Sequence, residues 1–135
     1  LAVAGALQPL MTPYTTHREL VAWQQAMLLA ETVYRETADF PKEEIYGLTR
    51  QIKKSAISVP SNIAEGCARN TLAEYVHFLG IACGSIAELE TQLELAICFG
   101  FMKANAASLG QADRAARLLR ALRRSLKARA ADEAG

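Results

Sequence analysis

The chain has 135 residues, of which 51% are hydrophobic and 21% are charged, and 15 Lys and Arg nearly balance 14 Asp and Glu. This composition is typical of one globular all-helical domain with its own core, and it excludes a disordered chain. The three cysteines, Cys67, Cys83 and Cys98, are spaced by at least 15 positions, which excludes a disulfide framework or zinc pattern and favours the reducing cytoplasm.

The charges are unevenly distributed along the chain. Residues 1–102 hold 7 basic and 11 acidic residues, a formal charge of −4, whereas residues 103–135 hold 8 and 3, a formal charge of +5. A basic C-terminal segment on an acidic body could bind a polyanion. It could equally pair with acidic neighbours within the domain or between subunits.

Residues 1–16 are interpreted as a flexible N-terminal arm or as sequence foreign to the native protein. The apolar stretch at 1–7 is short and has no basic residue before it, so it does not fit a secretory signal. The chain has no uninterrupted run of 18 apolar residues. We therefore predict no membrane-spanning helix and no membrane partner.

The first predicted helix covers residues 18–38. Thr16 is the expected N-cap, with Glu19 completing a capping box, and the Asp39-Phe40-Pro41 string ends the helix. Its apolar residues repeat at spacings of three and four, which predicts one buried face. These residues are Leu20, Trp23, Met27, Ala30 and Tyr34.

The second predicted helix begins near Lys42, with Glu43 and Glu44 in its first turn, and ends at Gly66. Its predicted core positions are Ile45, Leu48, Ile52, Ala56, Val59 and Ile63. Pro60 removes one backbone donor from the middle of this pattern, so a kink is expected there and not a clean stop.

The third predicted helix begins after Thr71, which can form a capping box with Glu74, and Gly100 supplies its stop. The expected core positions are Leu72, Tyr75, Leu79, Ala82, Ile86, Leu89, Leu93 and Ala96. A second apolar set widens the buried surface and includes Val76, Phe78, Ile81, Cys83, Leu95 and Phe99. A helix that is apolar over more than one face needs more than one neighbour.

The fourth predicted helix covers residues 108–130, and residues 131–135 are expected to fray. Its core stripe is Ala115, Leu118, Leu119, Leu122 and Leu126. The opposite side is basic, with Arg114, Arg117, Arg120, Arg123, Arg124, Lys127 and Arg129. Four amphipathic segments with short connections predict an all-α, up-down antiparallel four-helix bundle over residues 17–130, with the second helix kinked at Pro60.

Five strings along these segments carry a family resemblance. They are ELVAWQ at 19–24, FPKEE at 40–44, YGLT at 46–49, VPSNIAEG at 59–66 and GSIAELETQL at 84–93. Their order and spacing over residues 17–103 resemble the bacterial four helix bundle protein family, also called the 23S ribosomal RNA intervening-sequence proteins. The resemblance implies a four-helix bundle, a homopentameric ring and no enzymatic activity. It also extends to the accessory proteins of diversity-generating retroelements, which bind nucleic acid and a reverse transcriptase.

The string at 60–66 is the most specific polar motif, and two interpretations of it stay open. In the structural one, Ser61 or Asn62 satisfies a carbonyl freed by Pro60, while Glu65 pairs with Arg69 four residues on. In the functional one, the kink displays Ser61, Asn62, Glu65 and Arg69 as a polar patch for a partner.

The basic stripe of Arg117, Arg120, Arg124 and Lys127 follows helical spacing along one face. It fits a solvated face, a set of salt links in an interface, or a track for nucleic-acid phosphates, which would bind with a strong salt dependence. No aromatic residue follows Phe101, which disfavours stacking on single-stranded nucleic acid.

Residues that could support metal or ligand chemistry have simpler interpretations. A di-metal bundle site needs two Glu-x-x-His pairs, and the chain has only Glu74 with His77. The acidic residues Glu88, Glu90 and Glu94 are therefore expected to pair with arginines of the fourth helix or of a neighbouring subunit. The aromatic residues Trp23, Tyr34, Tyr46, Tyr75 and Phe78 are expected in the core or in a subunit interface.

The sequence contains no phosphate loop, G-x-G-x-x-G, H-E-x-x-H or familiar Ser-His-acid order. We therefore predict a non-enzymatic cytoplasmic protein without metal or cofactor. The favoured function is a homopentameric interaction scaffold for a protein partner. The alternative is a nucleic-acid-binding accessory factor that uses the basic fourth helix.

Overall fold

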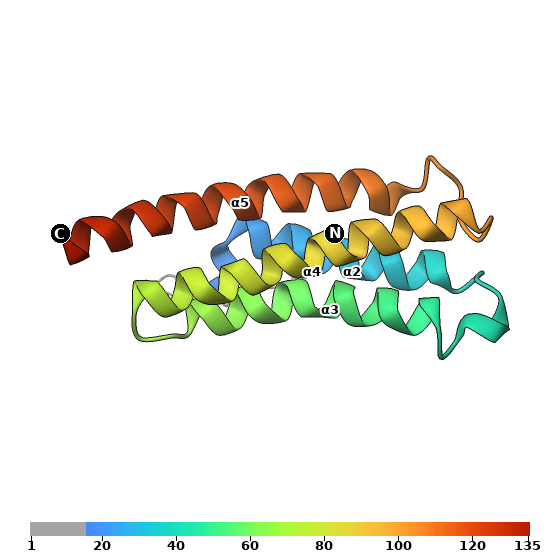
Figure 1. Ribbon diagram of the computed structural model, residues 1–135, viewed down its shortest axis with the longest axis horizontal. Helices are drawn as coiled ribbons and strands as arrows, with labels where there is room; N and C mark the ends of the chain where they lie inside the picture. The colour runs from blue at the N-terminus through green and yellow to red at the C-terminus, as the bar shows by residue number, and fades with distance from the viewer. Residues whose placement is uncertain (1–15) are drawn as a thin grey trace.

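The computed structural model describes residues 16–135, and most of the predicted N-terminal arm lies outside this range. Four α-helices run alongside one another in alternating directions (Figure 1). They are α2 (Val21–Thr37), α3 (Leu48–Cys67), α4 (Leu72–Cys98) and α5 (Ala107–Ala134), with short 3-10 turns η2 (His17–Glu19) and η3 (Lys42–Glu44). Each helix packs on the next, α5 packs back on α2, and residues 16–135 contain no strand. The predicted all-α four-helix bundle is confirmed.

The core is built from apolar side chains that recur on one face of each helix. It includes Leu29 and Val33 of α2, Ile52, Val59 and Ile63 of α3, Leu79, Ile86, Leu89 and Leu93 of α4, and Leu119 of α5. Alanines fill the positions where helices approach closely, such as Ala26, Ala56, Ala82 and Ala112, all fully buried. The predicted core positions of α4 are buried except for Leu72 and Tyr75, which are half-buried. The prediction for the second apolar set of this helix is wrong in part, because Ile81, Leu95 and Phe99 are exposed.

The predicted core face of α2 is wrong in its rotation. Trp23 is buried, but Met27 and Ala30 are only half-buried and Tyr34 is 44% exposed. The buried face instead follows the smaller residues Ala22, Ala26, Leu29 and Val33. The buried face is thus shifted by one residue relative to the predicted stripe, and Trp23 is the one position of that stripe that is buried.

Two predicted helix starts are also wrong. α2 begins at Val21, because Leu20 is extended and separates it from η2, and the Thr16 side chain makes no capping bond. α3 begins at Leu48, and the residues from Lys42 to Glu44 form a separate turn that leaves Ile45 exposed. Glu44 still supports the N-terminus of α3, since its Oε1 accepts a bond of 3.0 Å from the Leu48 N–H.

The other helix ends agree with the sequence. The Thr71 hydroxyl accepts a bond of 3.1 Å from the Glu74 N–H, so the predicted cap of α4 is confirmed. At the other end Gly100 adopts φ of 80°, and the N–H of Phe101 donates to the Ala96 carbonyl at 2.8 Å. This arrangement is the glycine-dependent stop expected at that position.

Helix α3 is continuous through Pro60, where a kink was predicted, and α5 extends beyond its predicted end. α3 continues through Pro60 to Cys67, so the proline does not end it, as expected. α5 continues to Ala134, four residues into the segment predicted to fray. In Figure 1 its last turns project past the ends of the other helices.

Helix α4 is the most apolar of the described helices. Among residues 16–135 it is the one helix that is long and apolar enough to cross a membrane, by length and composition only. The core helix of a bundle meets the same criterion, so this is weak evidence for a span.

Candidate functional site

Asn62 holds α3 to α4 through Ser58. Its Nδ2 donates to the Ser58 carbonyl at 2.8 Å and to the Ser58 Oγ at 2.9 Å, and that Oγ lies 2.7 Å from the Oγ of Ser85 on α4. The carbonyl freed by Pro60 belongs to Ala56, four residues earlier. The expectation that Asn62 satisfies that carbonyl is therefore wrong, because the amide binds Ser58 instead.

The remaining residues of this motif lie at the surface. Glu65 and Arg69 form the predicted ion pair at 2.8 Å, across the C-terminal end of α3, which ends at Cys67. The Arg69 guanidinium also lies 4.6 Å from the ring centroid of Phe78 on α4. Ser61 is exposed and Asn62 is half-buried, so the four predicted residues comprise one interhelical anchor and three surface side chains.

A second candidate site is a groove of 330 Å³ between α4 and α5, which we call the basic groove. It is lined by Cys83, Arg120, Arg123, Arg124 and Lys127. Three of these cations belong to the predicted basic stripe. The fourth stripe residue, Arg117, lies outside the groove and pairs with Asp113 of its own helix at 2.7 Å.

Arg123 is the cation of the basic groove that the predicted stripe omitted. Its Nε donates to the Val76 carbonyl on α4 at 3.2 Å, which fixes the side chain across the interface. Gly80 makes room for it, since an added Cβ would lie 3.1 Å from the Arg123 Nη2. A glycine inside an apolar helix was the sequence signal for this close approach.

Two groups near the cations of the basic groove, Cys83 and Glu90, have raised pKa values. Burial raises the pKa of the Cys83 thiol, and the nearby charges of Arg123 and Arg120 only partly oppose this shift. Burial also raises the pKa of Glu90, with repulsion from Asp113 adding to it. The groove therefore presents four cations around a neutral thiol.

The predicted pairing of the α4 acids with α5 is not found in this chain. None of Glu88, Glu90 and Glu94 forms a salt bridge within residues 16–135. Glu88 and Glu94 are exposed on α4. The second alternative, pairing with a neighbouring subunit, stays a prediction.

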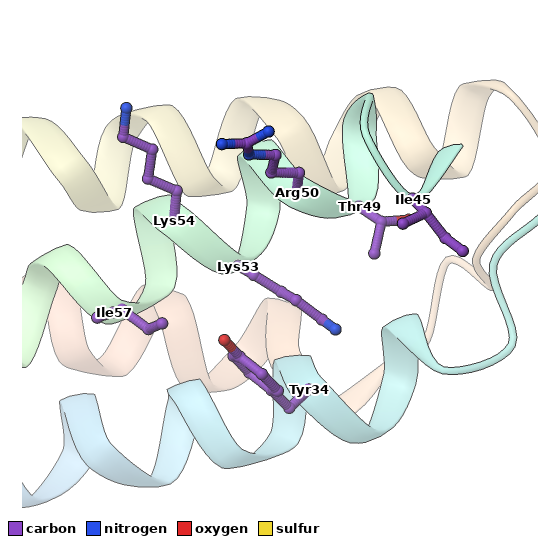
Figure 2. Close-up of a pocket in the computed structure, with 7 residues that line it drawn as sticks. All are labelled: Tyr34, Ile45, Thr49, Arg50, Lys53, Lys54 and Ile57. Carbon is purple, nitrogen blue, oxygen red and sulfur yellow. The ribbon is translucent and has the colours of Figure 1, made fainter. Parts of the chain in front are cut away.

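A third candidate site is a groove of 480 Å³ between α2 and α3, which we call the α2–α3 groove (Figure 2). It is lined by Tyr34, Ile45, Thr49, Arg50, Lys53, Lys54 and Ile57. Figure 2 shows Lys53 reaching toward Tyr34, and its Nζ lies 4.6 Å from the ring centroid. Arg50 and Lys54 leave α3 on the side away from Tyr34. The site thus combines exposed apolar and cationic side chains.

The described residues assemble no group of three or more His, Cys, Asp or Glu able to hold a metal ion. Glu74 accepts a bond of 3.3 Å from the Thr71 hydroxyl as part of its cap, and His77 is exposed and stacks edgewise on Phe78. The Glu74 side chain thus takes part in the helix cap, and the His77 ring contacts Phe78.

Comparison with known protein families gives a match over most of the chain. The family model described as 23S rRNA-intervening sequence protein matches residues 18–121. This range includes α2, α3, α4 and the part of α5 that carries Arg117 and Arg120. A search of curated proteins found no match.

Proposed function

This chain belongs to the 23S rRNA-intervening sequence protein family, and on that premise we propose that it is a non-enzymatic, self-associating scaffold. Its assembly is a homopentamer, as the family resemblance implies. The scaffold acts in the cytoplasm and presents repeated surfaces to a protein partner.

Large apolar side chains on the surface of a complete bundle carry this proposal. Eight of them are 40–85% exposed: Val21, Tyr34, Ile45, Tyr46, Ile57, Ile81, Leu95 and Phe99. The core beneath them is already closed, with ten large side chains of all four helices almost fully buried. Three of them, Tyr34, Ile45 and Ile57, line one groove. A contiguous set of exposed apolar residues marks a surface where proteins associate.

The test is the mass of the purified chain in solution, measured by light scattering or sedimentation across micromolar concentrations. We expect a single species of five times the chain mass of 14.7 kDa. A monodisperse monomer at these concentrations would contradict the scaffold.

The basic groove favours a second function, binding of structured nucleic acid. Arg120, Arg123, Arg124 and Lys127 converge on one groove, and a ring would repeat that groove in every subunit. Repetition turns a weak phosphate site into a stronger one if all copies reach the same ligand.

This second function is tested by binding to labelled structured RNA and duplex DNA across a salt series. The double variant R120E/R124E should weaken binding and flatten its salt dependence, because fewer counterions are released. Arg123 is left in place because it holds α5 to α4. R117E is the matched control, since Arg117 lies on the same helix outside the groove. Equal losses for both variants would count against the groove.

A further inference from the structure

The α2–α3 groove has an apolar residue at either end and cations between them. Ile45 and Ile57 are 51% and 47% exposed, and Arg50 and Lys53 lie between them along α3. Figure 2 shows Ile45 and Ile57 at opposite ends of the lining residues, with Lys53 between. Neither Arg50 nor Lys53 forms a salt bridge with another side chain in residues 16–135. The groove therefore offers unneutralised positive charge flanked by two apolar contacts.

The outer side of α4 carries the complementary pattern, and we call it the α4 face. Ile81, Glu88 and Leu95 follow at intervals of seven residues, which places them on one side of the helix about 10 Å apart. Ile81 and Leu95 are 40% and 41% exposed, and Glu88 is exposed without an ion pair in the described chain. This surface therefore offers, between two apolar contacts, a carboxylate that forms no ion pair, although Lys54 of its own subunit lines the same pocket.

The α4 face also permits close approach. Gly84 lies between Ile81 and Glu88, and a Cβ added there would meet no atom within 4 Å. Gly84, Ala87, Glu88, Thr91 and Gln92 line a shallow depression on this helix. Small residues beside the charge let another helical surface reach the backbone of α4 without a steric barrier.

We propose that the α4 face of one subunit docks in the α2–α3 groove of the next. Glu88 faces Lys53 of the neighbouring copy, while Ile81 and Leu95 cover the apolar ends of the groove. Because the two surfaces differ and lie on different helices, the contact is heterologous, the type that can close into a ring with an odd number of subunits. The inference rests on the proposed self-association and names the surfaces that produce it.

The two kinds of contact have separate effects. Burial of Ile45, Ile57, Ile81 and Leu95 supplies affinity, because each of these side chains loses contact with water. The charge pair fixes the register and disfavours docking of like-charged surfaces. Charge complementarity therefore identifies the occupant of the groove as a second copy of this chain.

Lys53 is a better site than Lys54 for testing this contact, because Lys54 lines a different pocket, between α3 and α4. Lys54 and Glu88 of one chain line the same pocket between α3 and α4, so Lys54 already lies near an acid of its own subunit. Lys53 instead reaches toward Tyr34, on the side of α3 that faces α2. A charge change at Lys53 thus reports on the α2–α3 groove.

The experiment is a charge swap followed by sedimentation of the full chain. E88K and K53E each place like charges in the contact, and we expect the concentration of half-dissociation to rise about tenfold or more in each. The double variant K53E/E88K restores opposite charges in every contact of the ring, so its assembly should return toward that of the wild type. E133K and R129E are the matched controls, because both sites are exposed on α5 outside the two surfaces and outside the basic groove.

The outcomes separate this inference from the proposed function. If the wild-type chain is a monomer, self-association itself is contradicted. If the wild type assembles but the single variants behave like their controls, or the double variant stays dissociated, the contact lies elsewhere and only this inference fails. Circular dichroism of each variant confirms that the bundle is folded.

Discussion

The hydroxyls of Ser58 and Ser85 lie 2.7 Å apart across the interface between α3 and α4. The Asn62 amide completes the contact by donating to both the hydroxyl and the carbonyl of Ser58. Partly buried polar groups linked in this way fix the register of two helices, because sliding either helix would leave a donor or acceptor unpaired.

The first prediction concerns this chain of hydrogen bonds. N62A should lower the free energy of unfolding by about 1–2 kcal/mol, because it removes two bonds to Ser58. S61A, at the exposed neighbouring position, should change it by less than about 0.5 kcal/mol. Urea titrations of both variants at one protein concentration test this, since self-association also contributes to stability. Equal effects would show that Asn62 is not an anchor.

The second prediction compares two helical glycines. A Cβ at Gly66 would lie 2.9 Å from the Phe78 Cβ and 3.1 Å from the Tyr75 carbonyl oxygen, so G66A should cost about 1–3 kcal/mol. At Gly110 of α5 an added Cβ would meet no atom within 4 Å outside the backbone of its own helical turns. G110A should therefore stabilise the chain by about 0.5–1 kcal/mol, because alanine restricts the unfolded chain more than glycine. Thermal unfolding of the two variants should show shifts of opposite sign.

The third prediction concerns the end of α4. Gly100 has φ of 80°, a conformation that costs other L-residues about 1–2 kcal/mol. G100A should lower the free energy of unfolding by that amount, and G100N by less, because asparagine tolerates this conformation better. Urea unfolding of both variants provides the measurement. A G100A variant as stable as the wild type would mean that the turn can adopt another conformation.

The fourth prediction is a pH dependence at Glu90. The pKa of this carboxyl is raised above its ordinary value of 4.5, first by burial and then by repulsion from Asp113. Its protonated form is therefore favoured in the folded state, and the stability it contributes is lost as the pH rises through the raised pKa. E90Q should match the wild type near about pH 4 and become the more stable chain toward pH 7. Urea midpoints measured across this range test the trend, and a difference independent of pH would contradict it.

The sequence predicted α4 best, because local signals and the core pattern agree there. The Thr71 cap, the Gly100 stop and the buried series from Leu79 to Ala96 all have the expected roles. The face of α2 was mispredicted because two overlapping series at three-and-four spacing exist on that helix. Tyr34 is larger than Val33, but the close contacts that select Val33 involve other helices and are invisible in a local pattern.

The candidate sites were less predictable than the fold, because they depend on contacts between distant residues. The spacing of Glu65 and Arg69 is local, and their ion pair was predicted correctly. The position of Arg123 depends on Gly80 and Val76 of another helix, and the Asn62 contact depends on Ser58 and its neighbour on α4. Helical spacing predicts which residues share one face of a helix. The contacts of Arg123 and Asn62 depend instead on how α3 and α5 pack on α4, which local spacing does not reveal.

The residues of α5 that line the basic groove differ in how firmly the bundle holds them. Leu126 is the last residue of this helix that is buried, and nearly every residue from Lys127 onward is exposed. Beyond that point helicity depends on local propensity and on extension from the packed turns, so it is a helix–coil equilibrium of its own. Arg120 and Arg123 belong to the packed part of α5, whereas Lys127 lies at the boundary. An anion that binds to Arg120, Arg123 and Lys127 together would shift this equilibrium toward the helix. Binding would then lengthen the ordered part of α5.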